Sequence, residues 1–60
     1  MDTTAKLLAL AAPLTAMLVA AAPSPMRAML TDDAVVLLAE GRSDLEIHEI
    51  LSRSLADFEG

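Results

Sequence analysis

The spacing of apolar residues predicts an amphipathic helix near the end of the chain. Apolar side chains there recur every three or four residues, which places them on one helical face. They are Ile47, Ile50, Leu51, Leu55 and Phe58. Ser43 and Glu46 form a capping-box pattern before this stripe, in which the hydroxyl and the carboxylate each reach a free backbone amide. We therefore predict a helix over residues 44–58, ahead of Gly60.

A shorter helix is predicted just before it. Residues 31–33 read Thr-Asp-Asp, and a hydroxyl cap followed by two carboxylates suits the positive end of a helix dipole. Gly41 provides the stop signal, because glycine adopts the left-handed conformation that ends many helices. We predict a helix over residues 32–40. A Ser-Pro pair is expected to open a short helical turn within the joint at residues 23–30.

The apolar residues of this shorter helix point to more than one side. Four of them are consecutive, at residues 35–38, so they surround the helix axis. One neighbouring helix covers only one side, and the other sides need the front half of the chain, a second copy or another protein. We predict that the hairpin docks such a protein partner, or a second copy as a homo-oligomer, through eight residues. These are Val35, Val36, Leu38, Ile47, Ile50, Leu51, Leu55 and Phe58.

The front half of the chain carries no charged residue between Leu7 and Met26. Its apolar run spans residues 7–22, a length between the ~7–15 residues of a signal-peptide core and the ~20 residues of a membrane-spanning helix. Pro13 interrupts the run, and an interior proline costs a helix ~3 kcal/mol in water. We therefore expect a helix that is kinked or broken near Pro13.

Three interpretations of this run stay open. It is a signal peptide removed before Ala22, which Lys6 ahead of the run and small residues at its end favour. It is a retained segment that contacts a membrane, in which a face of small residues lets helices approach closely. Or it forms two short helices, over residues 4–12 and 13–22, buried in a larger assembly. The residues expected to contact lipid or another helix are Leu7, Ala9, Leu10, Ala12, Leu14, Ala16, Met17, Leu18 and Ala20.

Composition narrows the classes of protein. Sixty residues form one domain at most. The absence of cysteine excludes a disulfide scaffold and a cysteine zinc site, and a hydrophobic content of 55% excludes intrinsic disorder. Residues 1–30 carry one acid and two bases, whereas residues 31–60 carry eight acids and two bases. The net charge of −5 disfavours nucleic-acid binding, which rests on phosphate neutralisation by Lys and Arg.

One stretch resembles a known family. Residues 37–47 read Leu-Leu-Ala-Glu-Gly-Arg-Ser-Asp-Leu-Glu-Ile, and a Leu-Thr pair precedes them at residues 30–31. Over about residues 30–51 the chain resembles the first two helices of LuxR-type helix-turn-helix domains. The resemblance implies a DNA-binding protein with a recognition helix after Leu51. The chain departs from the family at His48, where the family has a small alanine, and the segment after Leu51 has one basic residue and no recognition helix.

No constellation of catalytic or metal-binding residues is evident. Asp44, His48 and Ser52 lie at successive turns of one exposed helix, without a cleft or oxyanion donors. One histidine with scattered carboxylates falls short of the ligands that a zinc site needs. We therefore predict neither an enzyme nor a cofactor.

The sequence as a whole predicts an all-α chain, with an apolar N-terminal helix kinked or broken near Pro13 and a C-terminal α-α hairpin. The expected role is that of a non-catalytic interaction protein, membrane-associated through residues 7–22 or embedded as an accessory subunit of a larger complex. The alternatives are an exported protein that begins at about Ala22, a degenerate helix-turn-helix regulator, and a component of a soluble particle such as a virus shell.

Overall fold

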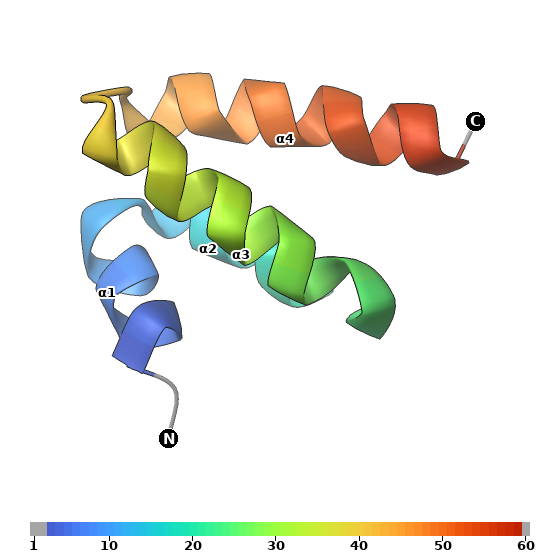
Figure 1. Ribbon diagram of the computed structural model, residues 1–60, viewed down its shortest axis with the longest axis horizontal. Coiled ribbons are helices and arrows are strands. Elements are labelled where there is room, and N and C mark those ends of the chain that lie inside the picture. The colour runs from blue at the N-terminus through green and yellow to red at the C-terminus, as the bar shows by residue number, and fades with distance from the viewer. Residues whose placement is uncertain (1–2, 60) are drawn as a thin grey trace.

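The described part of the chain folds into four α-helices, shown in Figure 1. The computed structural model describes residues 3–59, and over that range the prediction of an all-α protein is confirmed. The helices are α1 (Thr3–Ala11), α2 (Pro13–Ala21), α3 (Ser24–Ala39) and α4 (Asp44–Glu59). Gly60, expected to follow the last helix, lies outside the described residues.

Pro13 divides the apolar front half into two helices. Ala12 between them lies outside the helical region, with φ −145° and ψ 72°, because the ring of the following proline disfavours the helical conformation for the residue before it. Pro13 then takes the first position of α2, where its missing amide costs nothing. Nine residues make a helix only about 14 Å long. Within residues 3–59, no helix combines the length and the apolar character needed to cross a membrane.

α3 is longer than the sequence indicated. The predicted short turn after Ser24 and the predicted helix from residue 32 are parts of one helix, Ser24–Ala39, so the start signal at residues 31–33 was misinterpreted. The physical reason is a stripe of buried residues at four-residue spacing, Met26, Leu30 and Ala34, which runs straight through that signal. Burial of this stripe outweighs the local preference of Thr and Asp for a helix start.

The turn between α3 and α4 follows the prediction. Gly41 has φ +86°, the left-handed conformation expected of it. The amide of Gly41 donates to the Leu38 carbonyl at 3.0 Å, and the amide of Arg42 donates to the Leu37 carbonyl at 3.1 Å. These two bonds form a Schellman motif, which satisfies carbonyls left free at the end of α3. The predicted start of α4 at residue 44 is confirmed.

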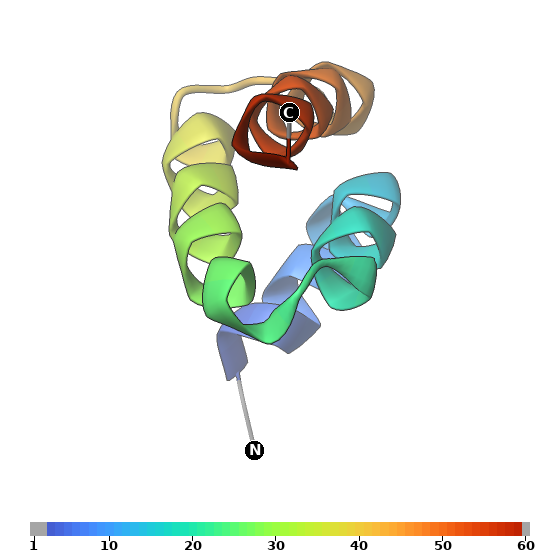
Figure 2. The ribbon, with the colours of Figure 1, turned by 90° about the vertical axis from the view of Figure 1, so that its right-hand side faces the viewer.

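The helices enclose one small core. Viewed along α4 in Figure 2, α2 and α3 stand on either side, α4 lies above them and α1 closes the opposite end. Each helix or its adjoining linker contributes to the core. The buried apolar residues are Leu8, Ala12, Val19, Ala22, Met26, Leu30, Ala34, Ile47 and Leu51. The front half is therefore part of the folded unit and not an appendage to the hairpin.

Candidate functional site

Asp44 joins the start of α4 to the start of α2. Its Oδ2 accepts a hydrogen bond from the Leu14 amide at 3.0 Å, and its Oδ1 accepts one from the Thr15 amide at 2.9 Å. These amides belong to the first turn of α2, whose own N-cap residue, Ala12, has no side-chain acceptor. Asp44 thus caps a helix that lies 29 residues earlier in the chain, in the position where a carboxylate also meets the positive end of the helix dipole.

Thr15 completes this contact. It is fully buried, and its hydroxyl lies 2.9 Å from Oδ1 of Asp44 and 3.2 Å from the Asp44 carbonyl oxygen. Desolvation by itself raises the pKa of Asp44. The hydrogen bonds from Leu14 and Thr15, with a smaller contribution from His48, together outweigh desolvation, so the pKa lies below its ordinary value. Asp44 is therefore a structural carboxylate that stays ionised at neutral pH.

The sequence did not reveal this contact, although two signals pointed toward it. Thr15 is the sole polar residue in the apolar run at residues 7–22, and a helix that starts after Ala12 has no cap of its own. Both observations are consistent with an acceptor from elsewhere in the chain, although water also satisfies free amides at a helix start. The predicted place of Asp44 in the first turn of its own helix is confirmed, but that place alone does not indicate a contact with α2.

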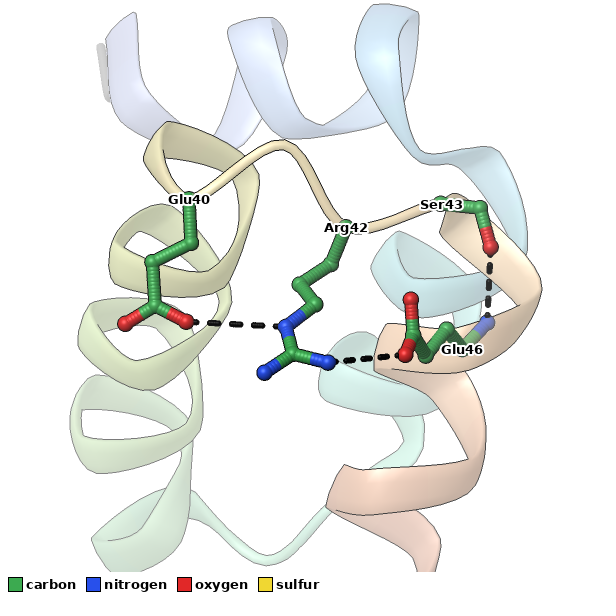
Figure 3. A network of polar contacts seen from close by, with 4 residues as sticks. All are labelled: Glu40, Arg42, Ser43 and Glu46. Atoms are coloured by element: carbon green, nitrogen blue, oxygen red, sulfur yellow. Dashed lines mark hydrogen bonds and ion pairs between the residues drawn. The ribbon is translucent and has the colours of Figure 1, made fainter.

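A second polar network surrounds the turn before α4 (Figure 3). The Glu46 amide donates to Oγ of Ser43 at 3.2 Å, which confirms that Ser43 caps α4. The Glu46 carboxylate was expected to reach back to the Ser43 amide; it accepts from Nη1 of Arg42 at 2.9 Å. Nε of Arg42 lies 3.5 Å from Oε1 of Glu40, and both carboxylates raise the pKa of the guanidinium. This network orders the turn and leaves Arg42 engaged on two sides.

The outer surface of α1 and α2 over residues 7–21 is apolar and uncharged, and Lys6, exposed in α1, lies just before it. Every exposed side chain between residues 7 and 21 is apolar, whereas the one polar side chain, Thr15, is buried. Most residues predicted to contact lipid or another helix lie on this surface. Leu7, Ala9, Leu10, Leu14, Met17 and Ala20 are exposed, Ala16 and Leu18 are half-buried, and Ala12 is buried. Leu8 and Val19 point inward, but the other large apolar side chains of this segment are exposed or half-buried while its one hydroxyl is buried.

The residues predicted to bind a partner do not form one surface. Ile47 and Leu51 belong to the intramolecular core, and Leu38 and Leu55 pack partly against it. Val35, Val36, Ile50 and Phe58 are exposed. Of the exposed four, Val35 lines an apolar groove of about 250 Å³ between α1 and α3, together with Leu7 and Leu38. Val36 and Ile50 line a different groove, of about 240 Å³, between α3 and α4.

A third hollow, of about 440 Å³, is polar and lies beside the N-terminal half of α3. Thr4, Ser24, Thr31 and Asp32 contribute to it, and so does Arg27, whose Nε donates to the Ala22 carbonyl at 2.9 Å. This bond ties the side chain to the linker that precedes α3. Arg27 therefore contributes to the local structure at the start of that helix.

The residues considered above for catalysis or metal binding either stabilise the fold or lie apart from one another. Asp44 is held by α2, which removes it from any triad with His48 and Ser52. Among the side chains that the structure describes, at residues 3–58, no three of His, Asp or Glu gather as they would to hold a metal ion. α4 continues without a break through Ser52, where the helix-turn-helix resemblance implied a second turn.

Comparisons with protein-family models, with curated proteins and with solved structures give no match to this chain.

Proposed function

We propose that this chain is a non-catalytic interaction protein, which attaches through the outer surface of α1 and α2 to a membrane surface or to a larger complex as an accessory subunit. One observation carries the proposal: among the described residues, ten large apolar side chains are exposed and six are buried. Four of the ten, Leu7, Leu10, Leu14 and Met17, belong to α1 and α2. Soluble monomers expose single apolar residues freely, whereas several large ones on one surface are typical of interaction sites.

The size of the effect supports attachment. Leu7, Leu10, Leu14 and Met17 are 61%, 84%, 46% and 71% exposed. Covering these four side chains would contribute roughly 4–8 kcal/mol, at about 1.5–3 kcal/mol for each fully buried large apolar side chain. Protein association costs about 4–15 kcal/mol in lost freedom of motion. This gain offsets only the lower part of that cost, so a stable complex needs further contacts elsewhere on the molecule.

The distribution of charge favours the same surface. α1 and α4 lie on opposite sides of the molecule (Figure 2), and α4 and the turn before it carry most of the acidic residues. An apolar target that meets α1 and α2 thus leaves the acidic side chains of α4 in water, where their hydration is retained.

The core contains residues that the alternative, an exported protein beginning at about Ala22, would lack. Leu8, Ala12 and Val19 are buried and precede Ala22, the first residue expected after removal of a signal peptide. Residues 22–60 alone would lose these side chains and also Thr15, which pairs with Asp44. This favours a segment that is retained, and N-terminal sequencing of material from cells checks it.

Fractionation of cells that express the chain at its natural level tests the proposal. We expect the chain in the membrane pellet or in a large particle, and we expect Met17→Lys to move it toward the free monomer because a charge then lies in the apolar surface. Glu49→Gln is the matched control, since it changes the net charge by the same amount. Glu49 is exposed on α4, away from the apolar surface of α1 and α2. A wild-type chain found wholly as free monomer would refute the proposal.

A further inference from the structure

The groove between α3 and α4 has an apolar floor and an open mouth. It is lined by Asp33, Val36, Leu37, Ile50, Leu51 and Ser54. Leu51 is buried at its base, and Leu37 is half-buried, whereas Val36 and Ile50 are exposed on its two walls. Four apolar side chains from two helices therefore converge on a space of about 240 Å³ that the chain itself leaves uncovered.

The apolar strip continues beyond the groove. Phe58 lies one turn after Ser54 on α4, and Met29 lies one turn before Asp33 on α3, so helical periodicity places both on the groove side. α3 and α4 separate toward this end of the molecule (Figure 1). Phe58, the sole aromatic residue of the chain, is 70% exposed there. From Ile50 to Phe58 the strip is about 12 Å long, which matches a little over two turns of a docked helix.

The charges around this strip are mainly acidic. Asp33 lines the groove, Asp57 directly precedes Phe58, and Glu40 lies one turn after Val36. Arg42, the cation at the closed end, is engaged by Glu40 and Glu46. Arg53, one turn after Ile50, is the cation of α4 itself. The strip thus combines an apolar floor with an excess of negative charge at its borders.

We propose that the α3–α4 groove, extended by Met29 and Phe58, binds a basic amphipathic helix of another protein. Such a helix lays its apolar face on the strip and places Lys or Arg beside Asp33 and Asp57. A second copy of this chain is a poor occupant, because its net charge of −5 adds acid to acid. An anionic bilayer is also a poor occupant of this groove, because the charges at its borders are mainly acidic. The inference deepens the proposed function and rests on it, since it assumes an interaction protein and adds the partner for a second surface.

Fluorescence anisotropy with two designed peptides tests this inference. Both have about 18 residues, long enough to form a helix in water, and share one leucine stripe. One carries lysine and the other glutamate on its polar face. We expect the lysine peptide to bind the wild-type chain saturably and the glutamate peptide not to bind. Ile50→Ala and Phe58→Ala should each weaken binding roughly five- to tenfold, because they remove apolar contacts and leave every charge in place.

Leu10→Ala is the matched control. It removes an exposed apolar side chain from α1 and should leave the affinity unchanged, with all variants first shown to be folded by circular dichroism. Failure of the lysine peptide to bind, equal binding of both peptides, or an equal loss in Leu10→Ala would overturn the inference. Saturable binding of a second copy or of zwitterionic vesicles that Phe58→Ala abolishes, with the lysine peptide inert, would also overturn it. None of these results depends on the fractionation of Met17→Lys, so the two proposals fail separately.

Discussion

Leu30 and Leu10 give the sharpest test of which leucines are inside the fold. Leu30 is fully buried at the centre of α3, whereas Leu10 is 84% exposed on α1. Leu→Ala in a packed core costs ~2.7–5 kcal/mol, since the transfer energy is lost and a cavity forms. Leu10 retains about a sixth of its surface in contact with the fold, so Leu10→Ala should cost less than ~0.5 kcal/mol. Helix propensity does not blur the comparison, because Ala and Leu are both strong helix formers.

Urea denaturation followed by circular dichroism at the helical band measures both substitutions. A domain of this size draws ~3–5 kcal/mol of stability from its core, so Leu30→Ala should be largely unfolded without denaturant. Leu10→Ala should unfold at nearly the wild-type midpoint, with an unchanged slope. Equal midpoints for the two variants, or a larger loss in Leu10→Ala, would refute the assignment of inner and outer faces.

Three further predictions concern the contact between α2 and α4 and the turn. Thr15→Val removes the buried hydroxyl that pairs with Asp44 and should cost ~1 kcal/mol in thermal or urea unfolding. Because the pKa of Asp44 is lowered in the folded chain, its stabilisation is complete above the ordinary value of 3.8 and is lost as the pH falls below it. Asp44→Asn should therefore lower the melting temperature at pH 7 and flatten its dependence on pH below 4, and an unchanged acid limb would contradict this. Gly41→Ala should destabilise by ~1–2 kcal/mol through backbone strain alone, since φ is +86° and no atom lies within 4 Å of the added methyl group; a neutral effect would contradict this.

The parts of the fold that the sequence predicted are those specified by local signals. Pro13 marked a helix break, Gly41 marked the end of α3, and Ser43 marked the start of α4. Each acts through its own backbone or through an amide within three residues, so neighbouring residues are enough to infer it. The stripe of α4 was also correctly periodic, and Ile47 and Leu51 supply its buried centre.

The parts that could not be predicted depend on residues far apart in the chain. Whether Thr31 starts a helix or lies within one is decided by burial of Leu30 and Ala34, which requires the positions of the other helices. The pairing of Thr15 with Asp44 spans 29 residues, and nothing in the local pattern selects that acid from the other eight. For the same reason, the eight predicted partner residues could not be divided into core and surface residues from the sequence. That division follows from the positions of the helices.

Met17 and Met26 provide the most direct test of the claim that a membrane or a larger complex covers the outer surface of α1 and α2. Met17 is 71% exposed on α2 and Met26 is 2% exposed in the core. Oxidation by dilute peroxide, read by mass spectrometry, reports the access of each thioether to solvent. In the isolated chain, we predict rapid oxidation of Met17 and slow oxidation of Met26; in native cell material, both should be slow. Protection of Met17 in a dilute monomer, or equally rapid oxidation of Met17 in native material, would contradict the account.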